Sequence, residues 1–282
     1  YSDWRRKYLS AANTCPWFER GLRSASNHLA ANPHGDFQVD SLRSIFRARV
    51  SALTNPRACY SWRARTTNQP VRLLSMANHQ ITSEAELREL MGEPAHELVV
   101  AKSADIITSP MKKFIELSPF VCLATQSKLG ASDVSPRGDA PGFVHVLDEK
   151  TLVIPDRPGN KRLGSVINII DQPGLALLFM IPGVLETLRV NGKGVISTDP
   201  ALLRLFVVNN KLPALVIVVT VQETFGHCSK AFRRSKLWQA DYRPEGTVPS
   251  LAQMMSGHLQ LDRELVGMLE GAIEEDAKNN MY

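Results

Sequence analysis

The feature that most constrains the fold is a series of short apolar segments, separated by turns, that runs from residue 120 to residue 224. Segments of this length, rich in β-branched residues and joined by short turns, predict antiparallel strands. Because few helices intervene, about six or seven strands would hide their edges most economically by closing into a small barrel. We therefore expect a mainly β (α+β) fold with flanking helices. The predicted strands are FVCLATQ, SDVSPRGD, FVHVLD, TLVIP, GLALLFMI, TLRVNGKGVIST and ALVIVVTVQET.

Helices are predicted on both sides of these strands. Ser83 and Glu86 form a capping box, and Gly92 is a stop signal, so we expect a helix over 83–92. Pro110 suits the first turn of a second helix. Further helices are expected in DPALLRLFVV after its cap Asp199, from His227 to Trp238, and in the tail, where Leu261, Leu265, Met268, Leu269 and Ile273 recur at helical spacing for packing.

Composition excludes several classes of protein. With 44% apolar residues the chain can bury a core, whereas its richest apolar stretches are about ten residues long and predict buried strands rather than membrane spans. The four cysteines are scattered without CxxC spacing, so we expect no metal site and a reducing, cytoplasmic location.

Residues 1–80 differ from the remainder of the chain. They hold twelve basic and four acidic residues and are broken by prolines. We expect a disordered or poorly structured N-terminal extension, followed by one domain over 81–282. Only 40–53 has helical periodicity. The composition is also that of an organelle transit segment, and the interleaved Trp4, Trp17, Tyr60 and Trp62 keep nucleic-acid binding open as a less favoured alternative.

The stretch IPDRPGNKRLGSVINI, residues 154–169, predicts an anion site. A strand ends in a loop that contains Gly159, and a helical pattern follows with Lys161 and Arg162 in its first turn. The first N–H groups of a helix lack internal partners, and the helix dipole favours negative charge there. Cations in a first turn oppose that dipole, so together with Arg157 they suggest a phosphate monoester ligand. The alternative is a strand-to-helix turn with solvated basic residues.

Four motifs in sequence order carry a resemblance to a known family. DVSPRGD, TLVIPDRPGNKRLGSVINI, GLALLFMIPGVLETLRVNGKGVIST and ETFGHCSKAFRRSKLW resemble the FMN-binding split β-barrel proteins of the pyridoxamine 5′-phosphate oxidase-like superfamily. The resemblance runs from about Ile81 to the end of the sequence. It implies a homodimer that holds two FMN molecules in grooves at the subunit interface.

The resemblance also implies roles for individual residues. Arg157, Asn160, Lys161 and Arg162 would contact the FMN phosphate, and the backbone around Ser135 and Pro136 would lie along the flavin. Arg137 would face the phosphate or the pyrimidine edge, unless it forms a surface ion pair with Asp139. Arg189 and Asn191, two residues apart on one side of a strand, would serve the flavin or the dimer seam. Lys230, with Arg233, would favour the reduced flavin, unless it belongs to a solvated basic helix.

For other residues we expect a structural role rather than a chemical one. His227 and Cys228 are adjacent and lack further ligands, so we expect no metal there. Cys122 lies within an apolar strand and is expected in the core. The chain lacks the RxVLLK-like strand and the arginine-bearing C-terminal segment of true pyridoxamine 5′-phosphate oxidases, so vitamin B6 synthesis is not expected.

The sequence thus predicts an FMN-dependent oxidoreductase that acts on an unidentified small organic substrate. The alternative is a non-catalytic flavin- or haem-binding carrier or sensor, and a deazaflavin or haem in place of FMN also stays open. No GxGxxG motif follows a strand, so the electron donor is not predicted.

Overall fold

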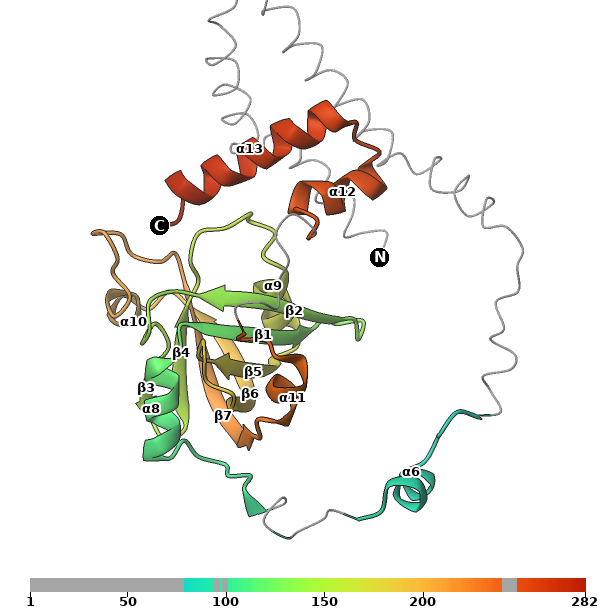
Figure 1. Cartoon of the computed structure of the whole chain (residues 1–282). Coiled ribbons are helices and arrows are strands. Elements are labelled where there is room, and N and C mark those ends of the chain that lie inside the picture. The colour runs from blue at the N-terminus through green and yellow to red at the C-terminus, as the bar shows by residue number, and fades with distance from the viewer. Residues whose placement is uncertain (1–78, 94–96, 98–100, 240–247) are drawn as a thin grey trace, which may run out of the picture. The chain divides into compact units, whose positions relative to one another are not determined.

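The computed structural model describes residues 79–93, 97, 101–239 and 248–282 (Figure 1). Contacts divide the chain into two units, and we call the one formed by Arg88–Arg243 with Met281–Tyr282 the barrel unit. The predicted extension over 1–80, its helical segment 40–53 and its aromatic residues lie outside the described residues, apart from 79 and 80. Among the helices in the described ranges, none is long and apolar enough to cross a membrane.

The barrel unit is built on one antiparallel sheet of seven strands. Its order is β2-β1-β5-β6-β7-β4-β3, so β2 and β3 are the edges. Every predicted strand is present, which confirms the mainly β fold. The strands are β1 (Phe120–Gln126), β2 (Ser132–Gly138), β3 (His145–Asp148), β4 (Thr151–Pro155), β5 (Gly174–Met180), β6 (Thr187–Ser197) and β7 (Val216–His227).

The register of the sheet separates an inner face from an outer face. Opposed residues of an antiparallel pair share a face. Leu123 of β1 opposes Leu177 of β5, which opposes Val190 of β6, and all three are fully buried. They belong to the main core cluster. The inner face is therefore the hydrophobic core.

The outer face carries smaller and half-buried side chains in the same strands. Cys122 and Ala124 of β1 oppose Leu178 and Ala176 of β5, and all four are partly exposed. The prediction that Cys122 lies in the core is wrong, because its position in the alternating pattern of β1 puts it on this outer face. Its partial burial still raises the pKa of the thiol.

A β-bulge interrupts the pairing of β6 with β7 between Asn191 and Gly192. A Cβ atom on Gly192 would lie 2.3 Å from the main-chain oxygen of Thr220, so only glycine fits there without a shift of the backbone. Two residues further on, a Cβ on Gly194 would meet side chains of β5 and of the helix after β4. The NGKG sequence thus brings β6 close to both neighbours.

Most of the described helices begin where their caps predict. α6 (Glu84–Met91) has the predicted cap at Ser83, and α8 (Ser109–Leu117) has Pro110 in its first turn. α10 (Pro200–Arg204) is capped by Asp199. α11 (Lys230–Ser235) is shorter than predicted, because His227 still belongs to β7, where it pairs with Thr187 of β6.

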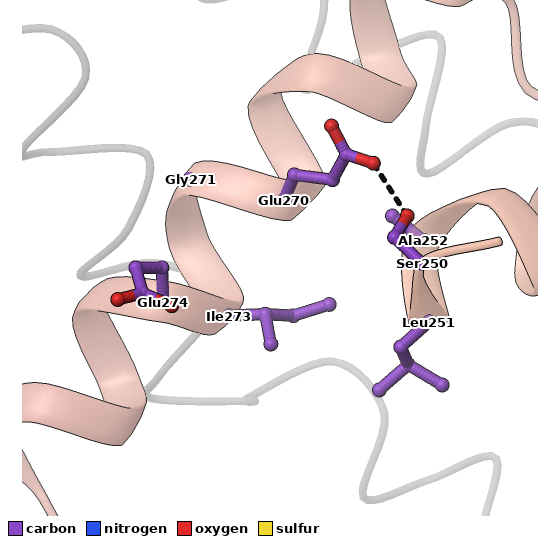
Figure 2. Close-up of a pocket in the computed structure, with 7 residues that line it drawn as sticks. All are labelled: Ser250, Leu251, Ala252, Glu270, Gly271, Ile273 and Glu274. Atoms are coloured by element: carbon purple, nitrogen blue, oxygen red, sulfur yellow. Dashed lines mark hydrogen bonds between the residues drawn. The ribbon is translucent and has the colours of Figure 1, made fainter. Parts of the chain in front are cut away.

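The predicted tail helix is two helices, α12 (Leu251–Leu259) and α13 (Arg263–Asn279). Gln260 adopts φ 53° and ends α12, and Asp262 caps α13. Leu265 and Leu269 are buried, as their spacing predicts. A cavity of about 460 Å³ lies between these two helices. Figure 2 shows the residues that line it, among them Ser250, whose hydroxyl contacts the Glu270 carboxylate.

Candidate functional site

The loop of residues 156–163 joins β4 to α9 (Gly164–Asp171). The prediction that Lys161 and Arg162 lie in the first helical turn is wrong, since α9 begins at Gly164. Lys161 and Leu163 both have φ 56°, a left-handed conformation that breaks the helical path before α9. The two cations therefore belong to the loop, where both are exposed.

The first turn of α9 faces β2 rather than solvent. Ser165 is buried, and its hydroxyl donates to the Asp133 carboxylate at 3.2 Å and lies 2.9 Å from the hydroxyl of Ser135. A carboxylate near a helix N-terminus is stabilised by the helix dipole. Asp133 thus supplies the negative charge that the sequence assigned to a phosphate, and the anion site must rest on the loop rather than on the helix dipole.

Two crossed ion pairs join the end of β2 to the end of β4. Arg137 pairs with Asp156, and Arg157 pairs with Asp139 at 2.6 Å. The alternative expectation of an Arg137–Asp139 surface pair is wrong, because each arginine reaches the aspartate of the other segment. Arg157 also donates to the main-chain oxygen of Phe206 at 2.8 Å.

These ion pairs link strands that do not pair through their backbones. β2 is one edge of the sheet, and β4 is next to the other edge. The side chains of the pairs are at most 20% exposed. Partly buried, hydrogen-bonded ion pairs fix geometry better than exposed ones. The base of the 156–163 loop is therefore held to β2.

Asn160 shapes the tip of the same loop. Its side-chain oxygen accepts a hydrogen bond from the N–H of Arg162 at 3.0 Å, a short turn of the kind that asparagine favours. Lys161 lies between these two residues. The loop thus presents two neighbouring cations on a backbone that Asn160 and the crossed ion pairs hold in place.

The outer face of β6 and β7 carries a second polar group. Arg189 and Asn191 both donate to the Glu223 carboxylate, at 3.0 and 2.7 Å. Ser103 donates to the other oxygen of Glu223 at 3.2 Å. The Nε atom of Arg189 is buried and has no hydrogen-bond partner within the described structure. A buried donor without a partner lowers the stability of the fold, unless a ligand binds there and accepts its hydrogen bond.

Aromatic and basic side chains surround this group. Arg189 lies 4.8 Å from the ring centroid of Phe225, and Lys102 lies 4.4 Å from it. The ring of His227 contacts Phe225. Burial, together with the charges of Arg189 and Lys102, lowers the pKa of His227, so the neutral imidazole is favoured at neutral pH.

Lys230 begins α11 and is exposed, next to Cys228. A hydrogen bond from the backbone of Lys230 lowers the pKa of the exposed Cys228 thiol, and the charges of Lys230 and Lys102 act in the same direction. Throughout the described ranges, no three His, Cys, Asp or Glu side chains gather as metal ligands would.

The structure brings the predicted site residues into two groups on opposite faces of the sheet. Ser135 and Arg137 point to the inner face, beside the 156–163 loop, whereas Pro136 points outward. Arg189 and Asn191 lie on the outer face, because Arg189 opposes Leu178 and Leu178 opposes Cys122.

Sequence reasoning missed the carboxylates that organise both groups. Asp133 could have been found, because residues 133, 135 and 137 of a strand share a face. Asp156 and Glu223 carry no comparable signal, since their partners come from distant strands.

A protein-family comparison matches part of the chain. Residues 107–228, from the approach to α8 through the end of β7, match the family model described as pyridoxamine 5′-phosphate oxidase. This stretch holds all seven strands, the loop, and Arg189, Asn191 and Glu223 of the outer-face group. Residues 107–228 are thus similar to the pyridoxamine 5′-phosphate oxidase family. No curated protein matches the chain.

Three solved structures are similar to part of this chain at low sequence identity. HupZ of Group A Streptococcus is 23% identical over 43% of this chain and 93% of that chain, with a TM-score of 0.36. A Clostridium acetobutylicum protein related to general stress protein 26 is 13% identical over 41% and 83%, with a TM-score of 0.31. An F420 reductase is 20% identical over 41% and 94%, with a TM-score of 0.30.

Proposed function

We propose that the protein is an FMN-dependent oxidoreductase that acts on a small organic substrate. The observation that carries the proposal is the loop 156–163, whose exposed cations Lys161 and Arg162 are held beside β2 by two crossed ion pairs. The match of the surrounding domain to the pyridoxamine 5′-phosphate oxidase model supports FMN as the ligand of such a loop.

The loop fits a phosphate monoester by its charge and its donors. Arg162 can bind phosphate oxygens through a planar fork of N–H donors, and Lys161 adds a compact positive charge. Asn160 would act through the turn that it forms. Arg137 and Arg157 already bind carboxylates, so they would hold the loop and contribute long-range positive charge rather than carry the ligand alone.

The outer-face group fits the polar edge of a flavin. The buried Nε–H group of Arg189 can donate a hydrogen bond to a ligand, and its guanidinium adds positive charge beside Asn191. Bound FMN supplies the electron-transfer chemistry, and the chain's own residues bind and orient it. A cation such as Arg189 or Lys230 near the pyrimidine edge favours the negative charge of the reduced state.

The separation of the two groups supports a homodimer. β2 and β6 are three strand positions apart, which corresponds to about 14 Å at the usual strand spacing. The two groups also face opposite sides of the sheet. One FMN could meet both groups if the outer face of a second copy of the chain covered the loop of the first. We therefore infer that FMN lies at a dimer interface.

An absorption spectrum of the purified full-length chain, with mass spectrometry of the released ligand, tests the cofactor. A flavin spectrum and the mass of FMN are expected after purification or after addition of FMN. A colourless protein that takes up no added FMN would contradict the proposal. A haem or deazaflavin spectrum would show that the cofactor is not FMN.

Turnover is a separate measurement. Bound FMN that NADH or NADPH reduces, and that oxygen or an organic acceptor reoxidises, is the result expected for an oxidoreductase. FMN that stays bound without redox turnover would instead identify a flavin carrier or sensor.

A further inference from the structure

Tyr282 makes three kinds of contact with the barrel unit, to which it belongs. Its hydroxyl donates to the Asp139 carboxylate at 2.7 Å. Its ring lies 5.6 Å from the Arg157 guanidinium. Its main-chain oxygen accepts a hydrogen bond from the Lys211 ammonium group at 2.7 Å. Two of these three partners are the ion pair that anchors the 156–163 loop.

The contacts complete the surroundings of Asp139. One carboxylate oxygen accepts from Arg157, and the other accepts from Tyr282 and from the N–H of Ala140. The Asp139 side chain is only 4% exposed. Burial alone would raise the pKa of Asp139, but these hydrogen bonds outweigh it and lower the pKa. The hydrogen bond to Asp139 correspondingly raises the pKa of Tyr282.

The contacts also restrict Arg157. Its Nε atom is held by Asp139, and its Nη1 atom is held by Phe206. A tyrosine ring near the guanidinium adds a cation–π attraction and screens the arginine from water. The guanidinium is thereby fixed in orientation at the residue that follows Asp156, where the loop leaves β4.

We propose that Tyr282 is a positioning residue for the cofactor-phosphate loop. It acts through the Asp139–Arg157 pair, and so sets the preference for a flavin that carries a phosphate over one that does not. This inference rests on the proposed function, because it assigns Tyr282 a role at the same FMN site. Tyr282 need not touch the ligand.

Two substitutions at position 282 separate its two interactions. Tyr282→Ala removes the ring and the hydroxyl, whereas Tyr282→Phe keeps the ring over Arg157 and removes the hydrogen bond to Asp139. Met281→Ala is the matched control, since Met281 is 62% exposed and adjacent in sequence. Each full-length variant is titrated with FMN and with riboflavin, and its circular dichroism spectrum and thermal midpoint are recorded.

Tyr282→Ala is expected to raise the dissociation constant of FMN about tenfold and that of riboflavin less than about twofold, and Tyr282→Phe to raise that of FMN about threefold. Met281→Ala should match the wild-type protein. An unchanged FMN preference in Tyr282→Ala, or an equal loss for both flavins in both variants, overturns the positioning role while leaving the proposed function intact. A wild-type protein that binds no FMN overturns the proposed function and this role together.

Discussion

Charged side chains near the 156–163 loop divide into those that hold the loop and those that it presents. Asp139 and Asp156 are committed to arginine partners, and the pairs are partly buried. Lys161 and Arg162 are exposed at the tip. Affinity for a phosphate should therefore depend most on the two tip residues, and stability should depend most on the pairs below them.

Removing both tip cations tests this division. The double substitution Lys161→Ala with Arg162→Ala is expected to weaken FMN binding by at least about a hundredfold, because two contacts are lost and charge-assisted hydrogen bonds to phosphate contribute about 1.5–3 kcal/mol each. Riboflavin, which lacks the phosphate, should bind nearly as before. Fluorescence titration with both flavins measures the difference.

The control for this variant is Lys112→Ala with Lys113→Ala, which removes the same charge from exposed positions of α8. If the control lost as much FMN affinity as the tip variant, the effect would be one of net charge and not of the loop.

Asp139 should give the stability of the fold an acid dependence. Its folded-state pKa is lowered below the ordinary value of 3.8, so it binds protons more weakly when folded than when unfolded. Its stabilising contribution is therefore present above that value and is lost as the pH falls through the lowered pKa. Thermal midpoints of the wild-type protein and of Asp139→Asn, measured between about pH 6 and pH 2, should converge at the acid end. A constant difference across that range would contradict this assignment.

At the level of secondary structure elements, the bulge in β6 depends on a single glycine. Gly192→Ala is expected to destabilise the fold by about 1–3 kcal/mol, because the new Cβ atom would collide with the backbone of β7. Gly226→Ala lies in the same strand pair and meets nothing within 4 Å, so it should have little effect. Chemical denaturation of both variants makes the comparison, and equal destabilisation would mean that the bulge tolerates a side chain.

Element types were predictable from the sequence, and some element boundaries were not. Alternation and turn residues predicted every strand, since local periodicity decides them. The start of α9 was misplaced because the pattern KRLGSVINII is helical throughout, whereas Lys161 and Leu163 adopt φ 56°. The tail was predicted as one helix, although Asp262 at the boundary is a helix-capping residue type.

The outer face of the sheet in the barrel unit carries partly exposed apolar side chains, namely Cys122, Ala124, Ala176 and Leu178. Substitution of Leu178 by Asp puts a charge between Cys122 and Arg189 on that face. If this face is the dimer seam, the variant should be monomeric in light scattering, whereas the wild-type protein should have twice the mass of one chain. Leu90→Asp, at a 69% exposed position of α6, is the control. A wild-type monomer, or a Leu178→Asp variant that is still dimeric, would remove the dimer from the account.

The candidate site was only partly predictable at this scale. The motifs located the loop and β2, because a family resemblance and local spacing both point to them. Three features of the site depend on strand order. They are the crossed ion pairs of Arg137 and Arg157, the contact of Asp133 with the start of α9, and the position of Ser135 and Arg189 on opposite faces of the sheet. Strand order is set by packing across the entire sheet, and no local pattern specifies it.

The central claim is that this domain holds a flavin by its phosphate. The most direct test is calorimetric titration of the flavin-free full-length protein with FMN and, separately, with riboflavin. We predict one FMN per chain and a dissociation constant at least about tenfold lower for FMN than for riboflavin, since the phosphate adds charge-assisted contacts. Equal affinity for the two flavins, or no binding of FMN, would contradict the account.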